Sequence, residues 1–259
     1  MSVLDKILTV KRHEVAALRE SPGESELRRR AASADAPRGF ARALRAGRGP
    51  RVIAEFKRAS PSKGEIRAGA DAAEIARGYE AAGAVALSVL TDREFFRGSL
   101  DDLRRARAAC RLPVLRKDFT IDPLQLIEAR AAGADAALLI VAALGDSQIR
   151  ELLACARELS LDALVEVHDE PELERALACG AELIGINNRD LRDFKTDVGV
   201  TRTLLPLAAG RPVVSESGLD DPAVVRALEA EGAAAFLIGE ALMREPDPGA
   251  ALRRLRGAQ

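Results

Sequence analysis

The apolar residues of this chain gather in eight short runs, and several of these runs end in polar or charged residues. Nearly continuous runs of Val, Ile, Leu and Ala are typical of parallel strands that are buried on both faces. They predict strands at 52–57, 84–90, 112–117, 135–141, 162–168, 182–187, 212–216 and 235–239. The stretches between them have helical spacing and predict helices at 71–81, 99–109, 122–131, 146–159, 170–178, 199–207, 221–231 and 248–256.

Turn and capping residues support these boundaries. Gly-Ala pairs, which suit helices that end in a left-handed turn, begin at Gly83, Gly133, Gly180 and Gly232. N-caps are predicted at Asp71, Asp122, Asp146 and Asp221, with Pro123 and Pro222 in the first helical position. An eightfold alternation of strand and helix in 259 residues predicts an α/β fold, a (β/α)8 TIM barrel that forms one domain over residues 1–259.

Residues 1–46 precede the first predicted strand. They contain one helical stripe, which predicts a helix capped by Ser2 or Asp5. The stripe consists of Leu4, Ile7, Leu8, Lys11, Val15 and Leu18. A loop containing Pro22-Gly23 and Pro37 is expected to follow. We interpret residues 1–46 as a helical extension that covers part of the barrel, and we leave open whether it also shapes the mouth.

Composition limits the classes of function. With a formal net charge of −1, the chain lacks the excess of basic residues expected of a sequence-independent nucleic-acid binder. Cys110, Cys155 and Cys179 have neither C-x-x-C spacing nor an even count, which favours free thiols in a reducing compartment. The N-terminus lacks a signal-peptide core, and the longest apolar stretch, 136–144, is too short to span a membrane. We therefore expect a cytoplasmic protein with neither nucleic-acid nor membrane partners.

Ionisable and amide residues end several of the predicted strands. Because side chains alternate along a strand, an inward Glu55 also places Lys57 inside the barrel and Val52 outside it. The same parity predicts further inward side chains at Lys117, Glu166, Asn187 and Glu216. Arg116 is expected to point outward with its head group in water. The inward groups would meet at the carboxyl-terminal mouth of the barrel, where (β/α)8 enzymes have their active sites.

Such a cluster is either a static ion-pair network or a set of groups that transfer protons. Nearly all basic residues of the chain are Arg, which makes the better static pair, whereas Lys can have its pKa tuned. The lysines at 57 and 117 therefore favour chemistry that needs an amine. His168, at the end of the fifth predicted strand, is a weak candidate for a supporting group. The sequence contains no metal-ligand cluster, Ser-His-Asp arrangement or dinucleotide fingerprint.

Two glycine-containing loops indicate a phosphate site. Ser215-Glu216-Ser217-Gly218-Leu219 and Leu237-Ile238-Gly239-Glu240-Ala241 follow the seventh and eighth predicted strands. In (β/α)8 barrels these loops often bind phosphate through backbone N–H groups. The segment 58–64 is rich in donors for an anion, but a solvated loop explains it equally well. Phe96 and Phe119 follow the second and third strands, where they would either flank an aromatic substrate or pack in the core.

Five segments in order resemble one family. They are Glu55-Phe56-Lys57-Arg58-Ala59-Ser60-Pro61-Ser62, Lys117-Asp118-Phe119, Glu166-Val167-His168, Gly185-Ile186-Asn187-Asn188-Arg189-Asp190-Leu191 and Ser215-Glu216-Ser217-Gly218. Together they resemble indole-3-glycerol-phosphate synthase of tryptophan biosynthesis, over the whole chain and including its N-terminal extension. The resemblance implies a carboxy-lyase that closes the ring of 1-(2-carboxyphenylamino)-1-deoxyribulose 5-phosphate with loss of carbon dioxide and water, and that requires no cofactor.

The resemblance also implies roles for the candidate residues. Lys117, Glu166 and Lys57 would share the acid and base steps, supported by Glu55, Asn187 and Glu216. The substrate would be bound by Ser60 and Arg189 and flanked by Phe96 and Phe119. Its phosphate would be bound by Ser217, Gly218, Gly239 and Glu240. The expected partner is the small phosphorylated aromatic substrate, and association with other enzymes of tryptophan biosynthesis is possible.

Two positions depart from the pattern of some family members. Ala59 stands where some carry a basic residue, so that anion contact is either absent here or supplied by Arg58 or Lys63. Glu240 stands where some carry Ser. A carboxylate at 240 would repel a phosphate dianion unless its side chain turned away and only its backbone N–H served.

Two other functions compete with this interpretation. An enzyme like phosphoribosylanthranilate isomerase would need a Cys general base at the end of the first strand, whereas that segment supplies Glu55 and Lys57. A non-catalytic barrel that binds phosphorylated metabolites would keep the phosphate glycines without the acid–base residues. Because this chain carries both sets, the synthase is favoured.

Overall fold

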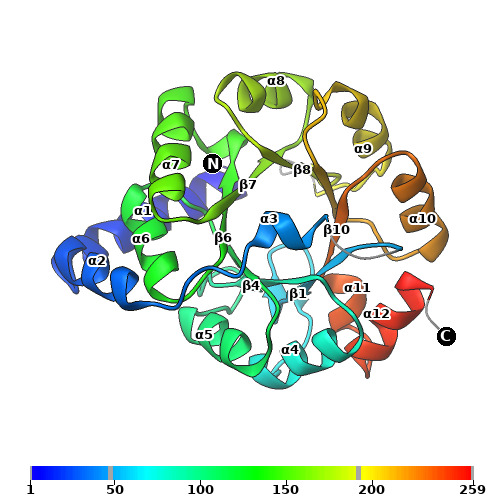
Figure 1. The fold of residues 1–259 in the computed structure, drawn as a ribbon, viewed down its shortest axis with the longest axis horizontal. Helices are drawn as coiled ribbons and strands as arrows, with labels where there is room; N and C mark the ends of the chain where they lie inside the picture. Colours follow the sequence, from blue (N-terminus) through cyan, green and yellow to red (C-terminus); the bar gives the residue numbers. More distant parts are fainter. Residues whose placement is uncertain (1, 46–48, 191–193, 258–259) are drawn as a thin grey trace.

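The barrel is closed by eight parallel strands that follow one another around the ring (Figure 1). The computed structural model describes residues 2–45, 49–190 and 194–257. The barrel strands are β1 (Val52–Phe56), β4 (Ala86–Leu90), β5 (Val114–Lys117), β6 (Ala136–Ile140), β7 (Asp162–Val167), β8 (Leu183–Asn187), β9 (Val213–Glu216) and β10 (Ala235–Ile238). The ring closes where β1 pairs with both β4 and β10. All eight predicted strands and the predicted TIM barrel are confirmed.

A helix follows each barrel strand on the outer surface of the ring. These helices are α4 (Ala72–Ala81), α5 (Leu100–Ala109), α6 (Pro123–Ala131), α7 (Asp146–Glu158), α8 (Glu170–Ala178), α9 (Gly199–Leu204), α10 (Pro222–Ala230) and α12 (Pro248–Arg256). Asp71, Asp122 and Asp221 cap their helices as predicted. The prediction for Asp146 is wrong, because Gly145 is the N-cap and Asp146 is the first helical residue. Shorter elements lie in the connections between these strands and helices. They are the four-residue α11 (Glu240–Met243), the 3-10 helices η1 (Val141–Ala143) and η2 (Leu205–Leu207), and the hairpin of β2 (Ala59–Ser60) and β3 (Gly64–Glu65).

Alternation along the strands separates two buried layers. On β1, Ile53 points into the barrel, where it joins Leu115 and Leu237 in the interior cluster. Val52, Ala54 and Phe56 belong to the larger cluster between strands and helices. The predicted parity is therefore confirmed for β1. Because side chains two residues apart share a face, the polar residues that follow the interior apolar ones also point inward, and they lie at the mouth of the ring.

Three helices precede β1: α1 (Val3–Glu20), α2 (Glu24–Ser33) and α3 (Phe40–Ala43). The predicted α1 is confirmed and is capped by Ser2. The predicted loop after it is wrong, because α2 forms there and α3 lies across one end of the barrel (Figure 1). Although α2 is highly charged, Leu27 and Ala31 pack against Leu124 and Ile127 of α6, and this contact supplies the apolar burial that the helix needs.

Lys11 of α1 carries a buried charge into the barrel loops. Its Nζ lies 2.7 Å from Asp92 Oδ2 and 2.9 Å from Asp118 Oδ1, and the side chain is only 1% exposed. Burial alone would lower the pKa of this amine, but Asp118 and Asp92 raise it. Asp118 also lies 3.3 Å from Nη2 of Arg116, a side chain that was expected to reach water and instead is buried. A second carboxylate, Glu128, lies 2.9 Å from Arg116 Nη1, so the guanidinium is paired without solvent.

Lys11→Met is expected to lower the free energy of unfolding by about 3–5 kcal/mol, because it leaves Asp92 and Asp118 buried without their shared cation. Urea unfolding followed by far-ultraviolet circular dichroism would measure the change. Lys6→Met, which removes an exposed amine from the same helix, is the matched control. Equal stabilities of the two variants would contradict the prediction.

Candidate active site

A cavity of about 660 Å³ opens at the carboxyl-terminal ends of the strands. Every catalytic, substrate and phosphate residue predicted from the sequence lines it. They are Glu55, Lys57, Ser60, Phe96, Lys117, Phe119, Glu166, Asn187, Arg189, Glu216, Ser217, Gly218, Gly239 and Glu240. These residues come from strand ends and loops around most of the ring, so the closed barrel brings together groups that lie far apart in the sequence.

Lys117 lies at the end of β5 among carboxylates from other strands. Its Nζ is 3.1 Å from Glu166 Oε2 on β7 and 3.6 Å from Glu216 Oε2 on β9. Burial alone would lower the pKa of the Lys117 amine, but the nearby carboxylates raise it above its ordinary value. The amine is therefore protonated at neutral pH, and it can donate to an oxygen that becomes negative within the cavity.

The two carboxyl groups beside Lys117 differ in charge state. For Glu166, the effect of burial is outweighed by Lys117 and His168, which hold the pKa below its usual range. For Glu216, burial together with repulsion from Glu166 and Glu55 raises the pKa to about 8. Glu166 therefore favours the ionised form, which can accept a proton, whereas Glu216 holds its proton more firmly than an ordinary carboxyl group. Carboxyl groups whose pKa values are pushed apart in this way take different roles.

Glu55 and Lys57 form a second acid–base pair at the end of β1. Lys57 Nζ lies 2.8 Å from Glu55 Oε1, and Ser88 Oγ donates to Glu55 Oε2 at 3.1 Å. Burial would raise the pKa of Glu55, but Lys57 and then Lys117 hold it below its ordinary value. The pair places the Lys57 amine at the cavity, directly after β1, which is the strand next to β10.

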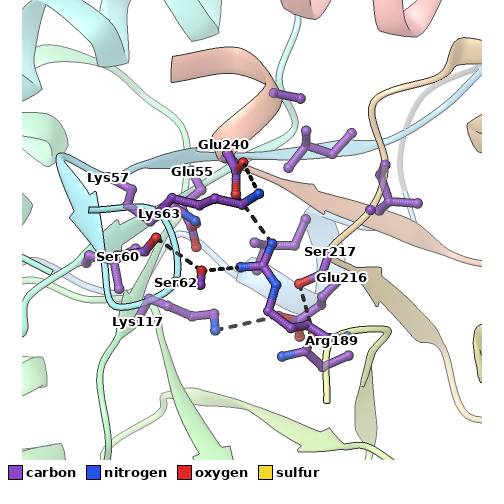
Figure 2. A pocket seen from close by; sticks show the side chains of 18 of the residues that line it. Glu55, Lys57, Ser60, Ser62, Lys63, Lys117, Arg189, Glu216, Ser217 and Glu240 are labelled. Carbon is purple, nitrogen blue, oxygen red and sulfur yellow. Dashed lines mark hydrogen bonds and ion pairs between the residues drawn. The ribbon is translucent and has the colours of Figure 1, made fainter. Parts of the chain in front are cut away.

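Glu240 is held by cations from three segments. Its carboxylate lies 3.8 Å from Lys63 Nζ, 3.3 Å from Arg189 Nη2 and 2.9 Å from Arg244 Nη2. Figure 2 shows Arg189 and Lys63 pointing toward Glu240, and Ser62 between Arg189 and Ser60. The side chain thus lies within the cavity rather than turning away from it. It contacts the same basic groups that an incoming anion would use.

The loops after β9 and β10 bring backbone groups to the cavity. Ser217 has a φ of 67° and Gly218 a φ of 72°, so two successive residues adopt the left-handed conformation. Ser217 Oγ donates to Asn187 Oδ1 at 2.9 Å, and Arg189 N–H donates to the same oxygen at 3.0 Å. Asn187 therefore joins the β8 and β9 loops. At Gly239, an added Cβ would lie 2.4 Å from Glu55 Oε1, so only glycine leaves that carboxylate in place.

Apolar side chains line the opposite part of the cavity. The rings of Phe96 and Phe119 lie with centroids 6.2 Å apart at an interplanar angle of 40°. Val3, Leu4 and Ile7 of α1 also line the cavity. The N-terminal extension therefore helps to shape the mouth, a possibility that the sequence left open.

The structure decides between the two basic residues expected to replace a contact at Ala59. Arg58 does not serve the mouth, because its guanidinium binds Asp102 at 2.6 Å and stacks 4.8 Å from the Phe56 ring centroid. Lys63 lines the cavity in its place. Leu191, the last residue of the fourth family segment, lies outside the described residues. Arg244 was missed, although it lies four residues after Glu240, which is the spacing of an ion pair on a helix.

The described part of the chain contains neither a metal-binding group nor a membrane-spanning helix. Within residues 2–45, 49–190 and 194–257, no group of three or more His, Cys, Asp or Glu side chains could hold a metal ion. Cys110, Cys155 and Cys179 are free. None of the described helices is long and apolar enough to cross a membrane.

Comparison with known proteins gives one family. The family model described as indole-3-glycerol phosphate synthase matches residues 4–255. A curated protein of Bordetella pertussis, named indole-3-glycerol phosphate synthase, is 55% identical over 261 residues, which cover 98% of each chain.

Solved structures with a similar fold are more distant in sequence. A 3-hexulose-6-phosphate synthase matches with a TM-score of 0.65 and 21% identity over 80% of this chain and 98% of its own. An N-acetylmannosamine-6-phosphate 2-epimerase from Clostridium perfringens matches with a TM-score of 0.60 and 13% identity over 75% of this chain and 88% of its own. At these identities the likeness shows the barrel fold alone.

Proposed function

The chain belongs to the indole-3-glycerol phosphate synthase family, and we propose that Lys117, Glu166 and Lys57 divide the proton transfers of its reaction. The reaction converts 1-(2-carboxyphenylamino)-1-deoxyribulose 5-phosphate to indole-3-glycerol phosphate by ring closure, decarboxylation and dehydration. The observation that carries the proposal is the position of the Lys117 ammonium between Glu166 and Glu216 inside the cavity.

Lys117 is the acid of the ring-closing step. When the aromatic carbon attacks the ketone of the substrate, its C=O π electrons move to oxygen, and the oxygen takes a proton. An alkoxide is a stronger base than an amine, so even an ammonium group of raised pKa can protonate it. Loss of carbon dioxide from the attacking ring carbon, which bears the carboxylate, returns the electrons of the broken C–C bond to the aromatic ring.

Glu166 and Lys57 serve the dehydration. The hydroxyl formed by ring closure must leave as water, which requires a proton at that oxygen and removal of a proton from the CH2 carbon next to the nitrogen, so that a C=C bond forms and the nitrogen of the indole keeps its N–H. Ionised Glu166 is the base, and Lys57 is the acid on the opposite side of the cavity. Each proton-transfer group is expected to contribute roughly 10²–10⁴-fold to the rate.

The two ends of the substrate are held by different parts of the mouth. We assign its carboxylate to Arg189 and Ser60, with the aromatic ring beside Phe96 and Phe119. The phosphate is assigned to the loops after β9 and β10, through Ser217, Gly218, Gly239 and the backbone of Glu240. The left-handed backbone at 217 and 218 supports this assignment, because successive N–H groups in such turns can converge on an anion.

Glu240→Ser is expected to lower the KM by roughly fivefold without changing kcat, since about 1 kcal/mol separates a carboxylate from a neutral side chain beside a bound anion. The serine would free Lys63, Arg189 and Arg244 for the substrate. Steady-state kinetics would measure both constants. Glu245→Ser removes a nearby carboxylate that pairs with Arg254 instead, and it is expected to leave the KM unchanged. A raised KM in Glu240→Ser would show that Glu240 organises these cations for binding.

Indole fluorescence tests the activity directly. The purified protein is incubated with the substrate, and emission of the indole product is followed, with little background because the chain contains no Trp. The expected result is a product signal that disappears in Glu166→Gln. A folded protein that binds the substrate but forms no indole would instead be a non-catalytic barrel for phosphorylated metabolites.

We further propose a cytoplasmic location and association with other enzymes of tryptophan biosynthesis. The free cysteines favour a reducing compartment. Association would pass a small phosphorylated product to the enzyme that consumes it. Fractionation of cells that produce the tagged chain, followed by identification of co-purifying proteins, tests both.

A further inference from the structure

His168 lies directly after β7, and the start of α8 fixes the orientation of its ring. Asp169 caps α8 by accepting the N–H of Glu172 at 3.0 Å, which turns the Glu172 side chain back over the β7–α8 connection. Glu172 Oε2 accepts the backbone N–H of His168 at 2.9 Å and lies 2.9 Å from ring Nδ1. One carboxylate oxygen of Glu172 therefore contacts both the backbone and the ring of His168.

The other ring nitrogen faces the catalytic carboxylate. His168 Nε2 lies 3.4 Å from Glu166 Oε1, while Glu166 Oε2 lies 3.1 Å from Lys117 Nζ. The His168 side chain is 11% exposed and that of Glu166 is 2% exposed, so water has little access to this contact. Each oxygen of Glu166 is thus approached by a different cation.

We propose that His168, oriented by Glu172, is a positioning residue that fixes the Glu166 carboxylate for proton abstraction. The proposal rests on the assignment of Glu166 as the base. Similar arrangements, in which a carboxylate orients a histidine that in turn orients a reacting group, recur in acid–base sites. A ring that served only to tie β7 to α8 would need the Glu172 contact, but it would not need a buried Nε2 that lies 3.4 Å from Glu166 Oε1 and has no hydrogen-bond partner among the described residues.

The charges around His168 and Glu166 determine in which direction the loss of His168 would change the pKa of Glu166. Burial alone would lower the pKa of His168, but Glu166 and Glu172 raise it to about 10, so the ring is cationic at neutral pH. Glu166 is also faced by Lys117 from β5, Glu216 from β9 and the amide of Asn187 from β8. Without the imidazolium, Lys117 and the Asn187 amide would have to offset burial and the neighbouring carboxyl groups.

His168→Gln tests the proposal through the pH dependence of kcat. Glu166 must be ionised to act as a base, and loss of His168 raises its pKa, so it becomes protonated at a higher pH than before. The acid limb of the kcat profile is therefore expected to move to higher pH by about one unit or more. At neutral pH, kcat is expected to fall roughly 10–100-fold with little change in KM. Glu172→Gln should move the limb in the same direction by less.

Control variants separate the possible outcomes. Glu170→Gln removes an exposed charge from the same helix and is expected to leave the profile unchanged. If Glu166→Gln retains activity, the assigned base is wrong. If Glu166→Gln is inactive but His168→Gln keeps its kcat and acid limb, the positioning role alone is overturned. A folded His168→Gln whose kcat falls with an unmoved acid limb would make His168 a structural tether, which also overturns the proposal.

Discussion

Lys117→Ala is expected to lower kcat by roughly 10³-fold or more while leaving substrate binding largely intact. The substitution removes the ammonium that lies 3.1 Å from Glu166 and 3.6 Å from Glu216, and with it the proton for the ketone oxygen. The phosphate loops and Arg189 lie on other segments and remain available to the substrate. Appearance of indole fluorescence measures kcat, and titration of the substrate under the same conditions measures KM.

Lys117→Arg separates the need for a proton donor from the need for a charge. A guanidinium keeps the positive charge among the carboxylates but is a poor proton donor at neutral pH, so the loss of kcat is expected to be nearly as large. Full activity of the Arg variant would mean that charge alone is required. Lys6→Ala removes an exposed lysine and controls for nonspecific effects. Near-wild-type turnover of Lys117→Ala would exclude Lys117 as the acid.

Gly239→Ala is expected to lower kcat on the order of 10²-fold, because it adds a single methyl group where Glu55 already lies. The new Cβ would approach Glu55 Oε1 to 2.4 Å and Glu55 Cβ to 2.9 Å. Glu55 is buried at the wall of the cavity, so its carboxylate can move away from the new methyl group only into the cavity. Its displacement would break the contacts to Lys57 at 2.8 Å and Ser88 at 3.1 Å, so the β1 acid–base pair would lose its geometry.

The kinetic constants show which role of Gly239 is lost. A fall in kcat locates the damage at Glu55 and Lys57, whereas a raised KM with unchanged kcat would locate it at the phosphate. Gly78→Ala is the matched control, since an added Cβ there meets nothing within 4 Å and the residue lies inside α4. Wild-type kinetics in both variants would show that the position of Glu55 is not critical.

The barrel and the cluster of ionisable groups at its mouth were predictable because both depend on short-range patterns. Alternation along β1 fixes which residues point inward, and parallel strands bring their carboxyl ends to one rim. Glu55 and Lys57 therefore had to meet groups from the ends of other strands once the ring closed. The family segments then supplied roles that the pattern alone does not contain.

The features that the sequence did not predict depend on contacts between distant segments. Lys11 occupied an ordinary position on an apolar stripe, and nothing nearby indicated that Asp92 and Asp118 would surround its amine. The helix α2 looked like a loop because its composition is polar, and its stability comes from packing on α6. The Glu240 carboxylate could not be placed, since its orientation depends on Lys63 and Arg189 from distant segments as well as on Arg244 at the end of its own helix.

The pairing of β1 with β10 has a consequence for how this chain folds as it is made. The strand β4 becomes available to β1 early in synthesis, whereas β10 emerges only after every other barrel strand. One edge of β1 therefore stays without its native partner for most of translation, and open strand edges promote aggregation of nascent chains. Docking of β10 seals that edge and brings Gly239 against Glu55 in the same event. Nearly the whole polypeptide must therefore leave the ribosome before the edge of β1 is covered and Gly239 lies against Glu55.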